Sequence, residues 1–446
     1  MTARATAFRS TMLQGAAQAV PDALGGDGID ILVGTSGDDV LQGFGGNDTL
    51  SGGLGDDVLD GGDGRDLASY RDIAAPLTID LRLAGTAQDT GGAGHDTLIG
   101  IENVTGGTGN DTITGDGGAN ILSGNAGDDW LFGGEGDDIL DGGAGNDALI
   151  GGNGTDTVTY ASATGGVSVV MWLRGFQPTG GAGSDVHSSI EIFVGSRFDD
   201  SFISNDFDHV LKGGAGNDGL YGQGGSDTLL GGLGDDWLDG GFGIDTVSYA
   251  DVAAGVTVDL ARFDRQDTGG AGADMLVDLE NLVGGGGNDT LYGAKYTNVI
   301  HGGAGNDTIY GRGGIDYLTG GEGDDVLVGG ADRDRMAGKE GADIFRLETL
   351  ADSGVGWRRD VIADFDGAAG DRIDLSLLDA DTVHDGRQGF QFLPGMTGFG
   401  GGLGELRYRH EGDLTIVMGD VNGDAVADFE IELVGTLTLQ ARDFMF

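Results

Sequence analysis

Aspartate recurs every nine residues along most of this chain, and carboxylates in such a pattern can hold a hard cation. Four arrays of nonapeptides contain 24 repeats, and position six of the nine is aspartate in 21 of them. Asn120, Asn298 or His209 occupies that position in the other three repeats. Position eight is a large apolar residue in every repeat except one, which has Ala68 there. The repeat is therefore G-G-x-G-x-D-x-U-x, where U is a large apolar residue.

These two fixed positions predict an all-β fold, a parallel β-roll or β-solenoid. The three residues around position eight form a short strand whose single apolar side chain points inward. The six residues before them form a glycine-rich turn, because glycine tolerates the backbone angles that tight turns require. Two nonapeptides then complete a coil of 18 residues, and successive coils stack at about 4.8 Å. Leu32, Leu50, Leu131 and Leu149 are expected in the core.

Such a core is too thin to stabilise the stack alone. One buried apolar side chain in each repeat contributes roughly 1.5–3 kcal/mol. Ordering the backbone of nine residues costs about 1–2 kcal/mol for each residue. An additional stabilising element is therefore needed, and the aspartates at position six are the candidates.

Calcium is the cation that suits these aspartates. Repeats n and n+2 lie one coil apart on the same edge, so Asp39 should stack near Asp57 and Asp129 near Asp147. Stacked carboxylates repel each other unless a cation lies between them. Calcium accepts six to eight oxygen ligands in flexible geometry, whereas magnesium demands a strict octahedron. Zinc favours cysteine and histidine, and the sequence offers no suitable pair.

The predicted metal ligands form two sets in the repeats and one set near the C-terminus. The position-six aspartates are Asp30, Asp39, Asp48, Asp57, Asp66, Asp111, Asp129, Asp138, Asp147, Asp156, Asp218, Asp227, Asp236, Asp245, Asp289, Asp307, Asp316, Asp325, Asp334 and Asp343. The position-four glycines, whose turns supply carbonyl oxygens, are Gly28, Gly37, Gly46, Gly55, Gly127, Gly136, Gly145, Gly216, Gly225, Gly234, Gly305, Gly314 and Gly323. Near the C-terminus, calcium-loop spacing is found in Asp420, Asn422, Asp424 and Asp428.

Pairing repeats n and n+2 gives at most 16 calcium sites in the four arrays. Three of these pairs contain Asn120, His209 or Asn298, so about 13–16 calcium ions are expected. The position-four glycine is missing before Asp200, which makes that residue a doubtful ligand. The alternative is a solenoid whose aspartates only cap turns. In the C-terminal loop, Ala425 stands where glycine is preferred, and a β-turn with Asx bonding is the alternative there.

The amino-acid composition limits the kinds of molecule that this protein can bind. The formal net charge is −51, which repels nucleic acid and anionic membranes. No cysteine is present and no run of 18 apolar residues occurs, so neither disulfides nor a membrane span is expected. The segment Met1–Leu24 has no apolar region of the kind found in Sec signal peptides. Export, if it occurs, should therefore use another route.

Three spacers of 35 or 36 residues separate the arrays and repeat one another. They begin at Tyr70, Tyr160 and Tyr249. Each contains an alternating strand pattern, such as 77–81, and an isolated nonapeptide head. The heads end in Asp96, Asp185 and Asp274. Stacking of the spacers as wider coils is the favoured interpretation, and protruding subdomains are the alternative.

The nine-residue period stops after Arg346, and strands are expected at 360–365, 371–375, 405–408, 414–417 and 429–433. The expected organisation is an N-terminal segment 1–24, arrays at 25–69, 106–159, 195–248 and 284–346, spacers at 70–105, 160–194 and 249–283, and a C-terminal β capping domain at 347–446.

The nonapeptides resemble those of the RTX, or hemolysin-type, calcium-binding repeat family, from Gly25 almost to the C-terminus. The region after Arg346 resembles the C-terminal domain of serralysin-type metalloproteases, and Asp443-Phe-Met-Phe446 resembles their export signals. This resemblance implies export by a type I secretion system in an unfolded state and folding in extracellular calcium. Calcium ions and the exporter are thus the implied partners, with an extracellular polysaccharide or cell surface as a further candidate.

No catalytic motif accompanies the repeats. The chain has no H-E-x-x-H or G-x-S-x-G and no cysteine nucleophile. The first hypothesis is therefore a secreted calcium-binding protein with a non-enzymatic structural or interaction role. The alternative is a polysaccharide-modifying enzyme, or a detached RTX module of a protease or epimerase. Its only indications are the recurring Arg82, Arg174 and Arg262, which can equally be exposed charges copied by duplication. Catalysis by Glu102, Glu191 or Glu280 is not expected. A pore-forming toxin would need an apolar amphipathic segment, and none is found.

Overall fold

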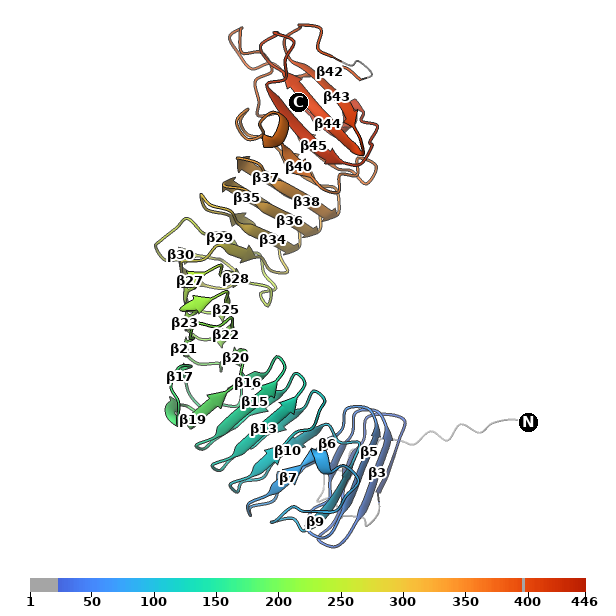
Figure 1. Cartoon of the computed structure of the whole chain (residues 1–446), viewed down its shortest axis with the longest axis vertical. Helices are drawn as coiled ribbons and strands as arrows, with labels where there is room; N and C mark the ends of the chain where they lie inside the picture. Colours follow the sequence, from blue (N-terminus) through green and yellow to red (C-terminus); the bar gives the residue numbers. More distant parts are fainter. Residues whose placement is uncertain (1–22, 395–397) are drawn as a thin grey trace, which may run out of the picture. The chain divides into compact units, whose positions relative to one another are not determined.

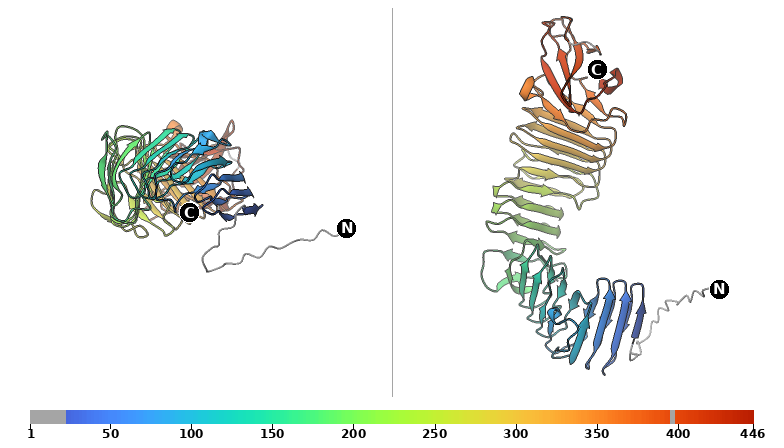
Figure 2. Two further views of the ribbon diagram at one scale, coloured as in Figure 1. Left: turned by 90° about the horizontal axis from the view of Figure 1, so that it is seen from below. Right: turned by 45° about the vertical axis from the view of Figure 1, so that its right-hand side comes forward.

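A computed structural model describes residues 23–394 and 398–446. The segment 1–22, and with it most of the N-terminal segment 1–24, lies outside the described residues. The chain divides into two compact units, residues 1–157 with 185–190 and residues 158–184 with 191–446. Each unit is a stack of short, mostly parallel strands, which confirms the predicted all-β roll (Figures 1 and 2).

In the first unit, two faces of the roll enclose a narrow apolar core. One face consists of β2 (Ile31–Val33), β4 (Thr49–Ser51), β6 (Leu67–Ser69), β10 (Asn103–Thr105), β12 (Ile121–Ser123) and β14 (Ile139–Asp141). The opposite face begins with β1 (Ala23–Gly26), β3 (Val40–Gly45), β5 (Val58–Asp63), β9 (His95–Ile99) and β8 (Gln88–Asp89). It continues with β7 (Thr78–Asp80), β11 (Thr112–Thr114), β13 (Trp130–Glu135), β15 (Ala148–Asn153) and β19 (Gly183–Ser188).

The second unit repeats this plan over a longer stretch. One face consists of β16 (Thr157–Thr159), β20 (Ile192–Val194), β22 (Val210–Ala215), β25 (Thr228–Leu233), β28 (Thr246–Ser248), β32 (Asn281–Val283), β34 (Val299–Ala304), β36 (Tyr317–Glu322) and β38 (Arg335–Glu340). The other face begins with β17 (Ser168–Val170), β21 (Ser201–Ile203), β23 (Gly219–Tyr221), β26 (Trp237–Asp239), β31 (Ala273–Val277) and β30 (Gln266–Asp267). It continues with β29 (Thr257–Asp259), β33 (Thr290–Tyr292), β35 (Thr308–Gly313), β37 (Val326–Ala331) and β39 (Ile344–Arg346). Shorter pieces are β18 (Gln177–Gly180), β24 (Gly224–Gly225) and β27 (Phe242–Gly243).

The strand register has the period that two nonapeptides for each coil require. Leu32 pairs with Leu50 and Leu41 with Leu59, each 18 residues apart. Leu41, Leu50 and Leu59 are fully buried, as position-eight residues should be. The side chains on either side of them point outward, because successive residues of a strand alternate between its faces.

The first and third spacers each divide one face of the roll and continue the other. In the first spacer, β9 pairs with β5 of the preceding array, whereas β7 pairs with β11 of the following array. On the opposite face β10 pairs with both β6 and β12, so that sheet is continuous. The third spacer does the same with β31, β29 and β32. The 3-10 turn η1 (Leu81–Leu83) lies between β7 and β8.

The C-terminal region closes the second unit. β40 (Asp360–Ile362) pairs with β38 of the roll and with β45 (Phe429–Val434). The antiparallel strands β43 (Glu405–Glu411) and β44 (Leu414–Asp420) extend that sheet, with β42 (Gln391–Phe392) beside β43. On the other face, β41 (Arg372–Asp374) joins β39 to the terminal strand β46 (Phe444–Met445). Two 3-10 turns, η2 (Gly356–Arg358) and η3 (Ala441–Asp443), complete this region.

Candidate calcium-binding columns

The position-six aspartates form two columns, one along each turn edge of the roll. Within a column, a carboxylate oxygen of each aspartate accepts a hydrogen bond from the backbone N–H of the aspartate one coil earlier. The Asp39 N–H donates to Asp57 at 2.9 Å, and the Asp129 N–H donates to Asp147 at the same distance. Asp57 and Asp147 are almost completely buried. The structure therefore places the predicted ligands in register, with one carboxylate for each turn.

The second carboxylate oxygen of most of these aspartates is buried and has no hydrogen-bond partner. Among the 16 pairs of repeats n and n+2, the later aspartate has such an Oδ2 atom in at least 14. These residues are Asp48, Asp57, Asp66, Asp129, Asp138, Asp147, Asp218, Asp227, Asp236, Asp245, Asp307, Asp316, Asp325 and Asp334. A buried charged oxygen without a partner costs several kcal/mol, so these atoms call for a cation.

The pairs that contain Asn120, His209 or Asn298 share this feature. In those pairs the later residue is Asp138, Asp227 or Asp316, and each has a buried Oδ2 without a partner.

The first aspartate of each array is different, because no coil with the same turn precedes it. The Oδ2 atom of Asp111 accepts a bond from the Gly107 N–H at 2.7 Å, and that of Asp289 accepts one from the Gly285 N–H at 2.6 Å. Asp30 similarly bonds the Gly26 N–H at 2.7 Å. These three predicted ligands cap their own turns, as N-cap residues do. At Asp39, Oδ2 bonds the N–H of Thr35, whereas Oδ1 is buried without a partner.

Asp200, which lacks the position-four glycine, has both carboxylate oxygens close to protein donors. Its Oδ2 atom accepts a bond from the Ser196 N–H at 2.5 Å, and its Oδ1 atom accepts one from the Val167 N–H at 2.7 Å. Both carboxylate oxygens are therefore engaged by protein donors.

Residues outside the arrays extend the columns, and sequence reasoning did not include them among the ligands. Asp96, Asp185 and Asp274 accept bonds from the N–H groups of Asp57, Asp147 and Asp236, at 2.9–3.0 Å. Their isolated nonapeptide heads were the available signal. Asp360 accepts a hydrogen bond from the Asp334 N–H, and Asp371 accepts one from the Asp343 N–H. The sequence around Asp360 and Asp371 keeps the D-x-U part of the repeat but lacks its glycines.

Two spacer glutamates also occupy column positions. Glu102 accepts a bond from the Asp66 N–H at 2.8 Å, and Glu280 accepts one from the Asp245 N–H at 2.9 Å. These carboxylates are bonded to the turns of the preceding coils.

Burial also changes the proton affinity of the columns. Loss of hydration raises the pKa of Asp147 to about 8; the Asp129 N–H opposes this rise, and the charges of Asp185 and Asp129 contribute to it. Burial raises the pKa of Asp316 to about 8 and that of Asp57 to about 6. A carboxyl group in such surroundings must be protonated or paired with a cation.

The ligand set fits calcium. No three His, Cys, Asp or Glu side chains converge on a metal position within 23–394 and 398–446, so backbone carbonyls would have to complete a coordination shell. The turns supply them at close range. Gly55 has φ +125°, and a Cβ atom there would lie 2.6 Å from the carbonyl carbon of Gly37 in the coil below. Carboxylate and carbonyl oxygens in a flexible arrangement are the ligands of calcium.

The C-terminal loop shows the Asx pattern. Asp420 accepts bonds from the N–H groups of Asn422, Gly423 and Ala425 at 2.7–3.2 Å. Asp428 accepts bonds from the Asn422 side chain and the Val421 N–H, and Asp424 bonds the N–H of Val426. The loop oxygens are therefore engaged within the loop, and calcium binding there stays a prediction.

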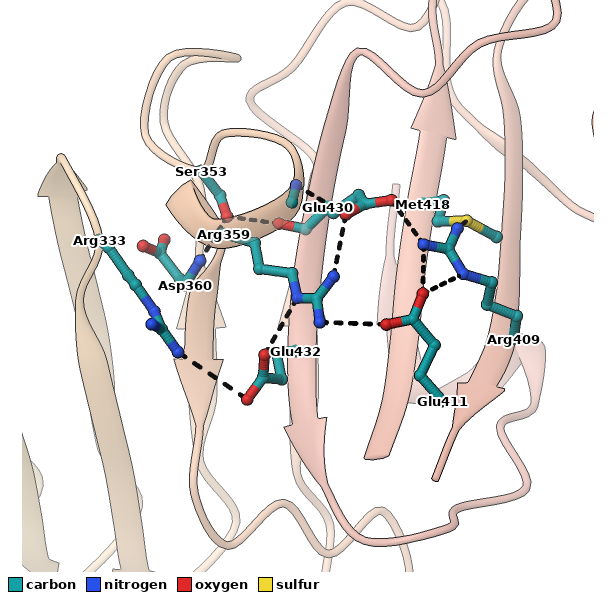
Figure 3. A network of polar contacts seen from close by, with 10 residues as sticks. Arg333, Ser353, Arg359, Asp360, Arg409, Glu411, Met418, Glu430 and Glu432 are labelled. Carbon is teal, nitrogen blue, oxygen red and sulfur yellow. Dashed lines mark hydrogen bonds and ion pairs between the residues drawn. The ribbon is translucent and has the colours of Figure 1, made fainter. Parts of the chain in front are cut away.

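A charged network holds the C-terminal sheet to the roll (Figure 3). Arg359, whose side chain is 12% exposed, lies within 3.0–3.3 Å of Glu430, Glu432 and Glu411. Arg333, in the turn just before Asp334, reaches Glu432 at 3.9 Å. Three glutamates thus share one largely buried guanidinium group.

Replacement of Arg359 by methionine should destabilise the C-terminal sheet by about 3 kcal/mol, because it removes the nearest cation to Glu432 and one of the two arginines that pair with Glu430. Urea denaturation of the calcium-loaded protein, followed by tryptophan fluorescence, measures this loss. Arg442→Met is the control, because that arginine is exposed and its ion pair with Asp443 is long, at 3.8 Å. Equal midpoints for the two variants would contradict the assigned role.

Two family models match the chain. The model of the peptidase M10 serralysin C-terminal region matches residues 233–446, which include the fourth array. The RTX calcium-binding nonapeptide repeat (4 copies) matches residues 24–59, 45–68, 99–131, 123–158, 194–229 and 212–247. No curated protein sequence matches the chain.

Several solved structures are similar to parts of it. The subunits AlgE6R3 and AlgE6R2 of the mannuronan C5-epimerase of Azotobacter vinelandii are 31% and 30% identical to it. The matches cover 36% and 37% of this chain, 78% and 92% of the subunits, with TM-scores of 0.19 and 0.20. The extracellular lipase LipA of Serratia marcescens is 14% identical over 57% of this chain and 39% of the lipase, with a TM-score of 0.18.

The repeats, their register and the buried aspartate columns define a calcium-binding β-roll. The chain belongs to the RTX calcium-binding nonapeptide-repeat proteins and carries a serralysin-type C-terminal domain. This combination is typical of extracellular proteins exported by type I secretion. No helix in the described parts of the chain is long and apolar enough to cross a membrane.

Proposed function

We propose that this protein is exported unfolded by a type I secretion system and folds outside the cell by binding calcium between its coils. There it has a non-enzymatic structural or binding role. The observation that carries this proposal is the row of buried, unpartnered Oδ2 atoms in the aspartate columns. A compartment poor in calcium would leave these charges unpaired, whereas millimolar extracellular calcium suits sites with dissociation constants of about 10⁻⁴–10⁻³ M.

Calcium should switch the chain between unfolded and folded states at pH 8. Far-ultraviolet circular dichroism of the chelator-treated full chain is expected to show little β-structure, and addition of 5–10 mM calcium, of the order of ten dissociation constants, should restore it. Magnesium at the same concentration is the control and should restore much less. A metal-free chain that is already fully β-structured would contradict calcium-coupled folding.

Export should depend on the last five residues. Deletion of Arg442–Phe446 is expected to leave the protein inside cells that carry its cognate exporter, because this segment resembles an export signal. In the folded protein β46 also pairs with β41. The purified deletion variant must therefore be checked for calcium-induced folding, which separates lost export from lost stability. Undiminished secretion would refute the signal assignment.

The absence of an enzymatic role is part of the proposal. Two of the recurring arginines pair with neighbours, since Arg82 contacts Asp80 at 2.7 Å and Arg262 contacts Asp264 at 3.0 Å. Both are exposed, which favours duplicated surface charges. Incubation with alginate and pectin, with analysis for unsaturated ends and altered uronate ratios, tests the enzyme alternative. Activity that Arg174→Ala abolished would establish that alternative.

A further inference from the structure

We propose that a pocket on one turn edge of the third array binds an uncharged sugar unit of a polysaccharide. The pocket is lined by Trp172, Ser204, Asn205, Asp206 and Gln223 and has a volume of about 190 Å³. We call it the Trp172 pocket. It lies within the second unit, on the column that contains His209 and Asp227.

Backbone hydrogen bonds between neighbouring coils position the walls of the Trp172 pocket. β17 pairs with β21, and the Met171 N–H continues this pairing by donating to the Ile203 carbonyl at 2.9 Å. Trp172 therefore lies beside the turn that begins at Ser204. Gln223 comes from the next coil, where the Gly224 N–H donates to the Asn205 carbonyl at 3.2 Å. Three separate segments thus converge on a framework of backbone bonds.

The chemistry of the lining matches a sugar ring. The Trp172 side chain is 51% exposed, so a large part of its indole is open to solvent. The apolar face of a sugar ring can pack on such an aromatic surface. Asp206 and the Gln223 amide make no hydrogen bond or ion pair within the described chain. A planar amide and a carboxylate beside an aromatic ring can bond adjacent hydroxyl groups.

Gln223 occupies a backbone position that favours glycine. It stands at position two of its repeat with φ +68°. A side chain there is held in a left-handed conformation that non-glycine residues rarely adopt. Phe44, Asn125 and Arg312 adopt the same conformation at position two of their repeats, so it belongs to this type of turn. Gln223→Gly is therefore a mild test substitution, because glycine removes the side-chain amide and fits the left-handed backbone without strain.

Exposed aromatic rings continue along the same edge. Phe207 is 75% exposed, and Phe242 is 87% exposed. Phe207 follows the pocket residue Asp206 directly, and Phe242 pairs with Gly224 in the short β24–β27 ladder. Phe207 and Phe242 lie two coils apart, with the coil of Asp227 between them. Rings spaced in this way along the edge would contact separate units of a chain that lies along it. This favours a polymer over a free monosaccharide.

The negative charge of the pocket and of the whole protein favours binding of neutral sugars over acidic sugars. The five lining residues include the carboxylate of Asp206 and no cationic side chain. The protein as a whole has a formal charge of −51. Uronate polymers would therefore be repelled, whereas neutral glucans would not.

The proposal extends the binding role given under the proposed function and can be tested separately from it. Isothermal titration calorimetry of the calcium-loaded full chain would use cellohexaose and maltohexaose as neutral probes and hexamannuronate as the acidic probe. At least one neutral hexaose should bind with a dissociation constant in the millimolar range or below, and hexamannuronate should not.

Trp172→Ala should weaken that binding at least tenfold, and Gln223→Gly should weaken it severalfold without loss of calcium-induced folding. Trp130→Ala is the matched control, because that exposed tryptophan lies in the other unit, and it should leave the affinity unchanged. The proposal is overturned if neither neutral hexaose binds, if hexamannuronate binds better, or if both pocket variants keep full affinity. Calcium-independent folding or enzymatic turnover would instead overturn the proposed function and leave these affinities unaltered.

Discussion

In the absence of calcium, the folded protein should lose stability as the pH rises from about 4 to about 8. The buried column carboxylates have pKa values raised to about 6 in Asp57, about 7 in Asp129 and about 8 in Asp147. In the unfolded chain an aspartate has a pKa of about 3.9. Between these values the folded state binds more protons than the unfolded state. The free energy of unfolding therefore falls with increasing pH, and the stabilisation is complete only below about pH 4.

Calcium should reverse this dependence, because it replaces the protons in the columns. The measurement is the folded fraction by circular dichroism at pH 5 and pH 8, in calcium-free buffer and with 10 mM calcium. The stabilisation by calcium should be clearly greater at pH 8. Addition of calcium to weakly buffered protein at pH 6.5 should also release protons. A metal-free folded fraction that is independent of pH would contradict the assignment of the carboxylates.

Asp147→Asn should have opposite effects on the metal-free and the calcium-loaded protein. The asparagine Oδ1 atom can still accept the Asp129 N–H bond, but the buried charge is removed. At pH 8 the metal-free fold should become more stable, since Asp147 has no partner for its Oδ2 atom and lies near the charges of Asp185 and Asp129. In calcium the same change removes a charged ligand. We expect about tenfold weaker binding at that site, or about 1.4 kcal/mol.

Asp137→Asn is the matched control for this pair of measurements. Asp137 is exposed at position five of the preceding repeat, and its Oδ1 atom accepts a bond from the Thr155 N–H at 2.8 Å. Its replacement should change neither the metal-free folded fraction nor the calcium concentration at half-folding. A loss of stability in both states for Asp147→Asn would indicate that this aspartate only caps its turn.

The sequence predicted the arrays well because their structure is local and periodic. Asp57 and Leu59 recur in phase with Asp39 and Leu41, and a separation of 18 residues allows only one stacking register. A shift of one residue would turn every leucine outward. The C-terminal strands were also predictable from alternation, whereas the pairing of β46 with β41 was not, because the two strands are about 70 residues apart in sequence.

The strand pairing of the spacers and the full set of carboxylates in the columns could be found only from the folded structure. Asp96 and Asp57 are 39 residues apart, and Asp360 and Asp334 are 26 apart, so no fixed period links them. The nonapeptide sequence alone also could not distinguish the role of Asp111 from that of Asp129. Asp111 caps its own turn, whereas Asp129 keeps a buried oxygen without a partner. That difference depends on whether a coil with the same turn precedes the aspartate.

The sequence by itself thus determined the repeat unit, the coil of 18 residues, the two columns of carboxylates and the choice of calcium. It did so because each nonapeptide contacts only its neighbours in the stack, and the sequence separation of those neighbours is constant. The tertiary structure alone decided how the spacers divide one face of the roll, which acidic residues join the columns, and where Trp172 meets Gln223. Those contacts join segments whose separation follows no period, so only the folded backbone brings them together.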